Sequence, residues 1–395
     1  MWTSSRASGD RIAAVDALRG FALLGILAVN IAFLGSGYRM AGLPEPGFDG
    51  PLDWGVRWFV TMFLENKFYL LFSFLFGYSL TLQLDSAARR GAAFSPMFLR
   101  RLAGLFLLGL AHGVLLFPGD ILATYAVVGL ALLALRTLPA RTALIAAVTL
   151  TSLLAVAFVL AAVAAGLGFH VPGTGSGGAA EALRTDMLLR GGPGMIIAEH
   201  LHELSMIAVL RVLFQGPAVL AACLVGLALG KQGALRAPNP ATLRTLQRYG
   251  FTVGIAGQAI HAYSTWGGSS GVLRLLGQAV DLVTAPLLAA AYAATLLRLL
   301  PHLPRLGRLL AAPGRMALTN YLGQSAICSL IFTGYGLALV DRVSPPAEML
   351  VALAVFAFQA AASHWWLHRH RYGPVEWLLR ALTYWKIPAK KVQPT

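Results

Sequence analysis

Long apolar runs recur along almost the whole chain, and they limit the fold more than any other feature. A helix needs about 20 mostly apolar residues to cross the hydrocarbon core of a bilayer, because its backbone polar groups find no other partners there. Ten segments suit this requirement: 17–34, 66–84, 98–117, 121–135, 144–169, 207–229, 251–265, 277–297, 316–340 and 349–367. The sequence therefore predicts an all-α fold, a polytopic membrane helix bundle of about ten transmembrane helices.

The composition agrees with this prediction. Of the 395 residues, 57% are hydrophobic and only 12% are charged, whereas soluble domains carry roughly 25% charged residues. A soluble chain of this length would need those charges to cover its surface. A chain that faces lipid does not, so the composition excludes a soluble protein.

The positive charges indicate how the chain crosses the bilayer. The net charge is +15, and 23 of the 31 Lys and Arg residues fall in alternate connections between the apolar runs. These connections are 6–19, 89–101, 136–141, 231–248, 298–315 and 369–391. Because basic loops stay in the cytoplasm, we expect a bacterial cytoplasmic (inner) membrane protein with both termini cytoplasmic. The scattered cations predict contact with anionic lipid and argue against a nucleic-acid partner.

The chain reads as a single integral membrane domain over residues 1–395. We expect residues 1–15 to form a cytoplasmic N-terminus, 169–203 an outer-side loop and 369–395 a cytoplasmic basic tail. A short interfacial helix is predicted over residues 54–64, before the second span. The charge-free segment 142–168 is typical of a lipid-facing helix.

Polar residues within spans are costly and are therefore candidates for function. Asp16 and Arg19 are three residues apart in the first span and share one face of a helix. They form either a structural ion pair or the polar floor of a pocket in which Arg19 meets an anionic group. Asn30 either joins helices by hydrogen bonds or lines a pocket. Lys67 either extends to the interface or serves a site.

The most chemical-looking group combines His112 with Asp120, followed by Tyr125. His112 lies near the outer end of the third span, and Asp120 opens the fourth after the turn at Pro118 and Gly119. A histidine oriented by a carboxylate is the arrangement of a general base. A helix cap at Asp120 and a packed histidine would explain the same residues.

Three further groups have weaker signals. Asn320 and Gln324 are four residues apart and either bond neighbouring helices or line an inner polar cavity. The E-H-L-H-E segment from Glu199 to Glu203 is weakly specific for metal and more typical of an interfacial helix start, so we predict no metal site. Cys223 and Cys328 lie inside apolar runs and read as small core residues.

Five segments resemble a known family. They are RIAAVDALRGFALLGILAVNI (11–31), KFYLLFSFLFG (67–77), HGVLLFPGDILATY (112–125), GRMALTNYLGQS (314–325) and RYGPVEWLLRALTYW (371–385). In this order they resemble the YeiB-like bacterial membrane proteins, the domain-of-unknown-function 418 family. The resemblance covers the whole chain and implies a multi-pass membrane fold.

The first span also resembles the opening of heparan-α-glucosaminide N-acetyltransferase, a transmembrane acyltransferase. Such enzymes move an acyl group from cytoplasmic acyl-CoA to an acceptor across the membrane. The resemblance implies roles for Asp16, Arg19 and Asn30. The animal enzyme has its active-site histidine in the loop after this span, whereas the loop here, residues 35–53, contains no histidine. His112 is the residue we expect in that role.

These observations lead to one main hypothesis and two alternatives. The main hypothesis is acyl transfer to an envelope or small-molecule acceptor, with His112 as base, Asp120 orienting it, and acyl-CoA as donor substrate rather than a permanently bound cofactor. The residues expected to bind substrate are Asp16, Arg19, Asn30, Lys67, Tyr125, Asn320 and Gln324. The alternatives are a transporter or exporter of a small molecule and a non-catalytic membrane scaffold.

Overall fold

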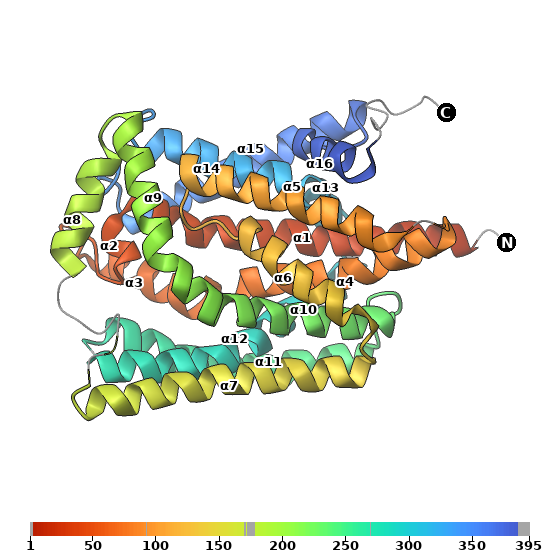
Figure 1. Cartoon of the computed structure of the whole chain (residues 1–395), viewed down its shortest axis with the longest axis horizontal. Helices are drawn as coiled ribbons and strands as arrows, with labels where there is room; N and C mark the ends of the chain where they lie inside the picture. The colour runs from red at the N-terminus through yellow and green to blue at the C-terminus, as the bar shows by residue number, and fades with distance from the viewer. Residues whose placement is uncertain (1–2, 92, 170, 172–177, 269, 386–395) are drawn as a thin grey trace.

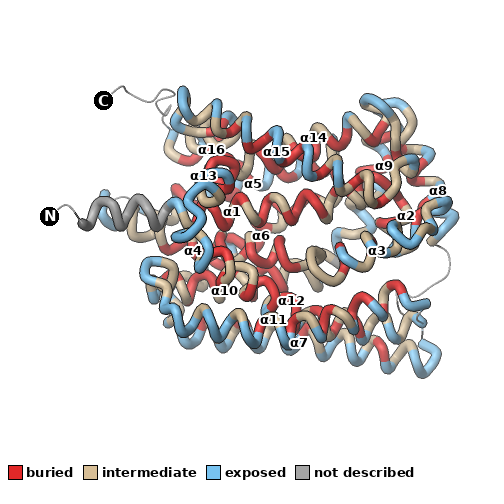
Figure 2. The backbone as a smooth tube through the Cα atoms, turned by 180° about the vertical axis from the view of Figure 1, so that it is seen from behind, coloured by how far each residue is buried: buried red, intermediate tan, exposed pale blue. Residues whose placement is uncertain are grey.

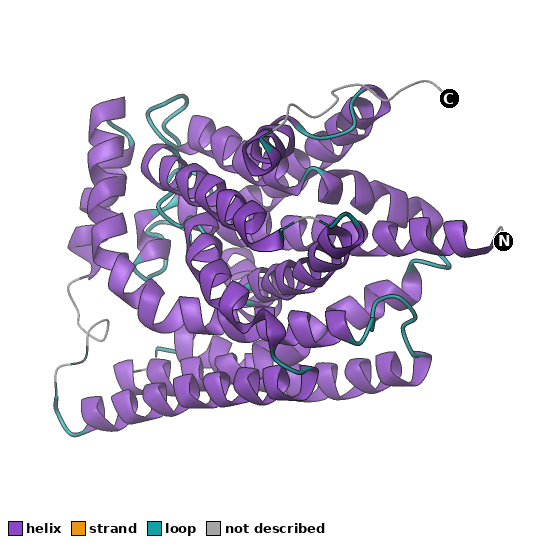
Figure 3. Cartoon of the chain, turned by 45° about the vertical axis from the view of Figure 1, so that its right-hand side comes forward, coloured by secondary structure: helices purple, strands orange, loops and turns teal. Residues whose placement is uncertain are grey.

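Nearly every apolar run forms a helix in the computed structural model, which describes residues 3–91, 93–169, 171, 178–268 and 270–385. Figure 3 shows helices joined by short loops, without a strand in these ranges. The elements are α1 (Thr3–Gly35), α2 (Gly37–Met40), α3 (Pro51–Phe59), η1 (Val60–Leu64), α4 (Lys67–Arg89), α5 (Phe94–Leu115), α6 (Leu122–Ala134), η2 (Leu135–Thr137), α7 (Ala140–Gly166), α8 (Gly178–Leu189), α9 (Pro193–Leu210), η3 (Arg211–Gln215), α10 (Gly216–Lys231), α11 (Pro240–Trp266), α12 (Gly271–Leu299), α13 (Pro304–Arg315), α14 (Ala317–Phe332), α15 (Pro345–Arg369) and α16 (Pro374–Tyr384).

Seven helical segments of the described chain are long and apolar enough to cross a membrane. They are Ala13–Gly35, Pro51–Arg89, Phe94–Leu115, Ala140–Gly166, Arg211–Lys231, Gly271–Leu299 and Pro345–Leu367. The other three predicted spans coincide with α6, α11 and α14, which are shorter or more polar. The fold is thus the predicted all-helical membrane bundle, and the prediction of a short helix before the second span matches α3 and η1.

Helix α1 runs through the middle of the bundle (Figure 1). Most of its residues from Ala17 onward are apolar, as suits a central helix, and Leu18, Leu23, Leu27 and Ile31 are completely or almost completely buried. It packs against α4, α13, α14 and α15. Residues of α1 therefore reach several cavities of the bundle.

The other helices form two groups on opposite sides of α1. Helices α7, α11 and α12 lie together along one edge, and α5, α14, α15 and α16 lie along the opposite edge (Figure 1). Figure 2 shows buried residues along α1 and exposed ones along α7. The exposed side chains of α7 include Ile145, Val148, Leu153 and Leu160, as expected of a lipid-facing helix.

The two ends of the bundle contain more helix than predicted. The predicted outer loop 169–203 contains α8 and the first part of α9, and its residues 170 and 172–177 lie outside the described residues. The predicted basic tail contains α16, which packs on α5 and α14. Short amphipathic helices at a membrane boundary bury one face only, so hydropathy alone does not reveal them.

Candidate functional site

The predicted histidine–carboxylate pair is formed. His112 lies in the last turn of α5, and Asp120 lies in the connection to α6. His112 Nδ1 is 2.8 Å from Asp120 Oδ1, and each residue is only 2% exposed. The turn between the two helices is short enough to return the carboxylate to the imidazole.

Asp120 also caps the next helix. Its second oxygen, Oδ2, accepts a hydrogen bond of 2.8 Å from the backbone N–H of Ala123, which satisfies a donor at the start of α6. The capping role and the pairing with His112 were alternatives in the sequence, and the structure shows both at once. The carboxylate is fixed from two sides and holds the imidazole in one orientation.

The far nitrogen of His112 is unoccupied. Nε2 is buried and has no hydrogen-bond partner in the described part of the chain. The imidazole lies beside the Tyr321 ring, with 5.0 Å between the ring centroids. Because buried nitrogens are normally paired, this one is a candidate for contact with a bound molecule.

A cavity lies close to this pair, although neither His112 nor Asp120 is among its lining residues. Tyr321 and the chain neighbours of Asp120, Gly119 and Ile121, form part of its wall. Its other lining residues are Ile26, Val29, Asn30, Leu64, Asn66, Phe68, Tyr69 and Gln215. This space, the Asn30 cavity, combines apolar walls with a few polar groups, as small-molecule sites usually do.

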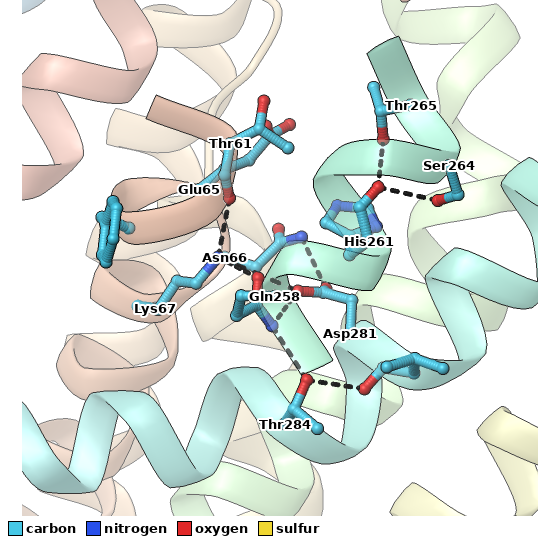
Figure 4. A network of polar contacts seen from close by, with 12 residues as sticks. Thr61, Glu65, Asn66, Lys67, Gln258, His261, Ser264, Thr265, Asp281 and Thr284 are labelled. Atoms are coloured by element: carbon cyan, nitrogen blue, oxygen red, sulfur yellow. Dashed lines mark hydrogen bonds and ion pairs between the residues drawn. The ribbon is translucent and has the colours of Figure 1, made fainter. Parts of the chain in front are cut away.

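Asn66 in the wall of the Asn30 cavity belongs to a buried polar cluster around Lys67, which is drawn in Figure 4. The Lys67 side chain is completely buried, and its Nζ donates to the Thr61 carbonyl, 2.9 Å away, and to Gln258 Oε1. Nζ also lies 4.0 Å from Asp281 Oδ1. Lys67 therefore does not extend to the interface but is neutralised inside the bundle.

Gln258 and Asp281 complete this cluster. Gln258 Nε2 donates to Asp281 Oδ1 at 2.9 Å and to Thr284 Oγ1 at 3.0 Å. Asp281 Oδ2 accepts from Asn66 Nδ2 at 2.8 Å. We refer to Thr61, Asn66, Lys67, Gln258, Asp281 and Thr284 as the Lys67 network.

The helix is interrupted where this network meets the cavity. Asn66 has a left-handed backbone with φ 68°, a conformation that asparagine tolerates better than most residues. It separates the π-helical turn η1 from α4. The hydrogen bond from Asn66 to Asp281 fixes this break against α12, so the network shapes one wall of the Asn30 cavity.

The predicted pair of Asp16 and Arg19 lies apart from the Asn30 cavity. Arg19 bonds Asp16 Oδ1 at 2.7 Å and Ser79 Oγ at 2.6 Å. This confirms the ion pair within α1, and the Arg19 side chain keeps 26% exposure. Neither residue lines the Asn30 cavity.

Other predicted residues bond helices together. Tyr125 is buried, and its hydroxyl lies 3.0 Å from Ser73 Oγ. Asn320 Nδ2 donates to the Pro313 carbonyl at 3.1 Å and to Ser363 Oγ at 2.9 Å. Gln324 is buried. None of these three lines the Asn30 cavity, and their substrate-binding role stays a prediction.

The two histidines of the E-H-L-H-E segment, His200 and His202, contact different partners. His200 Nδ1 lies 3.1 Å from the Val114 carbonyl, and His202 Nε2 lies 3.6 Å from Glu181. Glu199 is buried and bonds Arg184 and Thr185. The segment lies inside α9, which begins at Pro193, rather than at a helix start, and Glu199 and His200 are buried rather than solvated.

Several residues of the site were missed from the sequence. Gln258 lies within the predicted seventh span and Asp281 within the eighth. Polar residues in spans are the same signal that identified Lys67, so both could have been found. Gln215, within the predicted sixth span, carried the same signal, whereas Tyr321 did not, because a phenol in a span is common.

Known proteins resemble this chain over nearly its full length. Residues 229–386 match the sequence pattern of the family described as "Protein of unknown function (DUF418)". The chain is 33% identical to the uncharacterized protein YxaH of Bacillus subtilis (strain 168), with 98% of each chain covered. It is 30% identical to the uncharacterized protein YeiB of Escherichia coli (strain K12), covering 95% of this chain and 96% of YeiB.

A third relative extends the agreement to another species. An uncharacterized 39.9 kDa protein of Bacillus acidopullulyticus is 30% identical, with 95% of this chain and 94% of that protein covered. Identity of this level over whole chains, together with the matching family pattern, confirms the resemblance seen in the sequence motifs. The chain belongs to the YeiB-like DUF418 family of membrane proteins.

Proposed function

We propose that this protein is a membrane acyltransferase that moves an acyl group from cytoplasmic acyl-CoA to a hydroxyl or amine acceptor. One observation carries the proposal. His112 is held by Asp120 through Nδ1, its buried Nε2 has no partner among the described residues, and its ring lies beside Tyr321, which lines the Asn30 cavity. This is the arrangement that general-base catalysis needs.

The proposed reaction balances without a further reactant. With Nδ1–H donating to Asp120, Nε2 has the free lone pair and takes the proton of the acceptor O–H or N–H. The acceptor atom attacks the thioester carbonyl, so that a C–O or C–N bond forms and the C–S bond breaks. The proton then passes from Nε2 to the leaving CoA sulfur. Asn30 in the cavity wall would position the acyl carbonyl.

The donor would enter from the basic end of the bundle. Arg19 and its basic neighbours would meet the CoA phosphates, as arginine suits such groups. Along α1 the rise from Arg19 to Asn30 is about 17 Å, and the extended pantetheine arm of CoA is suited to cover such a span. Under this proposal the protein lies in a bacterial inner membrane. Both termini and the donor are on its cytoplasmic side, as the basic connections favour.

Transfer by the purified full-length protein in nanodiscs tests the proposal. Acetyl-CoA is supplied with a mixture of amine and hydroxyl acceptors, and release of free CoA thiol is measured. We expect His112→Ala and Asp120→Asn to lower acceptor-dependent release by at least about 100-fold, the usual contribution of a general base. Full activity in both variants would remove the mechanism.

A matched control separates catalysis from folding. His200→Ala removes another buried histidine, 3.1 Å from the Val114 carbonyl near the same end of α5. It is expected to keep most of the activity. Native mass spectrometry should find acyl-CoA retained by the wild type and by His112→Ala, but less by Arg19→Ala.

The Lys67 network favours transport as a second candidate function. A helix break beside buried charges is common at the substrate sites of transporters, and Asn66 breaks the chain beside Lys67 and Asp281. Under this alternative, flux of a small molecule into proteoliposomes would occur without any acyl donor. Flux that requires neither acyl-CoA nor His112 would favour transport, and neither flux nor transfer would favour a scaffold.

A further inference from the structure

A second cavity lies on the other side of α1. It touches Ala28, Ile31 and Ala32, whereas the Asn30 cavity touches Ile26, Val29 and Asn30. At 100° per residue these two sets fall on opposite faces of the helix. The second cavity, named here the Glu348 cavity, is therefore separate from the proposed catalytic site.

The Glu348 cavity is lined by both signs of charge. Arg39, Glu45, Arg57 and Glu348 contribute to its wall and are 5%, 4%, 2% and 4% exposed. Arg57 is occupied, because it bonds the Glu45 carboxylate at 2.6 and 2.7 Å and the Phe48 carbonyl at 2.8 Å. The ion pair of Arg57 and Glu45 therefore adds no net charge to the wall.

The Glu348 carboxylate has no hydrogen bond or ion pair with any described residue. A buried carboxylate without a partner is strongly unfavourable, so this group needs a proton or a positively charged ligand. A metal ion is disfavoured by the two arginines in the wall and by the lack of a suitable His, Cys, Asp and Glu cluster among the described residues. An ammonium group, which donates hydrogen bonds, fits the carboxylate better.

Arg39 supplies the complementary charge. Among the described residues it donates through Nη2, at 3.3 Å to Thr61 and 3.4 Å to Glu65, the second contact being an ion pair. Its other nitrogens are left available. It lines the same cavity as Glu348, yet the two form no ion pair within 4 Å. A ligand with a positive and a negative end would bridge this gap.

We propose that the Glu348 cavity binds a small zwitterionic group, with its ammonium end at Glu348 and its anionic end at Arg39. Such a group occurs in amino-acid-like solutes and in the ethanolamine phosphate headgroup of membrane lipids. The apolar walls formed by Ala28, Ile31 and Val60 suit the short methylene linker between the charged ends. The inference is independent of acyl transfer.

Two tryptophans offer a direct readout of binding. The Trp266 ring stacks on Arg39 at 4.7 Å and the Trp54 ring stacks on Arg57 at 4.9 Å. Full-length protein in phosphatidylcholine nanodiscs is titrated with phosphoethanolamine, glycine and β-alanine, and with the quaternary compounds phosphocholine and glycine betaine. Tryptophan fluorescence and calorimetry follow the binding, and the Trp54→Phe, Trp266→Phe double variant shows whether the optical signal arises at this cavity.

We expect saturable binding of a primary-ammonium ligand at least about tenfold tighter than of its quaternary counterpart, which cannot donate N–H hydrogen bonds. Glu348→Gln should abolish this preference, and Arg39→Gln should weaken both ligands. Glu181→Gln, which changes an exposed outer glutamate, and His112→Ala should bind as the wild type does.

Nanodiscs of a second lipid composition distinguish a lipid headgroup from a soluble ligand. If the lipid headgroup occupies the cavity, phosphoethanolamine should bind more weakly in phosphatidylethanolamine nanodiscs than in phosphatidylcholine ones, and equal affinity would indicate a soluble ligand. The proposal is overturned if no compound of the panel saturates, in which case Glu348 holds only a proton. It is also overturned if wild type shows no preference or if Glu348→Gln keeps it.

Discussion

At the scale of single residues, charged side chains inside the bundle are stabilised because most of them have a specific hydrogen-bond or ion-pair partner. Lys67 has Thr61, Gln258 and Asp281 around its ammonium group, and Arg57 has Glu45. Removing one member of such a pair leaves the other charge buried and uncompensated. The energetic consequence is therefore larger for a single change than for a matched double change.

The Lys67 network allows this to be measured. We expect Lys67→Met and Asp281→Asn each to destabilise the protein by about 3–5 kcal/mol. The double variant should lose less than the sum, because neither charge is then left alone. Thermal unfolding in nanodiscs checks this, with Lys231→Met as control, since Lys231 is exposed. Additive losses would show that the two charges are not coupled.

We expect the stability of the folded protein to depend on pH through Asp186. Burial raises the pKa of Asp186 in α8 from 3.8 to about 6, although the Gly37 N–H donates to its Oδ1 at 2.7 Å and opposes this rise. Because the folded pKa is raised, the favourable contribution is complete below pH 4 and is lost as the pH rises through about 6.

Replacement of Asp186 by Asn should remove this dependence and keep an acceptor for Gly37. The variant should unfold at the same temperature as the wild type at pH 4. At pH 7.5 it should be more stable, by up to about 3 kcal/mol for a shift of two units. Melting curves of both proteins across this range decide the matter, and parallel curves would refute the assignment.

At the scale of elements, close helix crossings depend on residues without side chains. Helices α4 and α10 pack with Gly77 against the backbone of Cys223 and Gly226 against the backbone of Phe74. A Cβ atom at either glycine would collide with main-chain atoms that cannot move independently. This contact places α4, and with it Lys67 and Ser73, in register with the rest of the bundle.

Ala substitutions test the crossing. Gly77→Ala and Gly226→Ala should each cost about 1–3 kcal/mol, the usual range for overpacking. Gly55→Ala in α3 is the matched control, because a Cβ there meets nothing within 4 Å, and it should be neutral or slightly stabilising. Unfolding in nanodiscs gives the comparison, and equal effects at the three glycines would contradict a tight crossing.

At the scale of the whole molecule, the two ends of the bundle differ in charge and in structure. Helices α2, α3 and α8 gather at one end, and α16 lies at the other with the start of α1 (Figure 1). The basic connections belong to the latter end, and the positive-inside rule predicts that this end is cytoplasmic. The proposed donor path and acceptor side both follow from this orientation.

Single cysteines test the orientation, because Cys223 and Cys328 are both buried and should give little background. Met187 in α8 is 59% exposed, and Arg305 in α13 is exposed at the basic end. We expect a membrane-impermeant maleimide to label Met187→Cys in intact cells and Arg305→Cys only after permeabilisation. The reverse pattern would invert the proposed topology.

The sequence by itself determined where the spanning helices lie, because the length of an apolar run is a local property and the bilayer demands about 20 residues. It also predicted the pairs that are close along the chain. Asp16 and Arg19 share a helical face, and a short turn separates His112 from Asp120. For these, local geometry leaves few alternatives.

Only the tertiary structure decided which distant groups meet. Lys67 and Gln258 bond across 191 positions, and Glu348 shares a cavity with Arg39. These meetings depend on how each helix is rotated about its axis and which neighbour it packs against, and hydropathy fixes neither. For the same reason the sequence suggested that Lys67 could extend outward, whereas packing against α11 and α12 buries it completely.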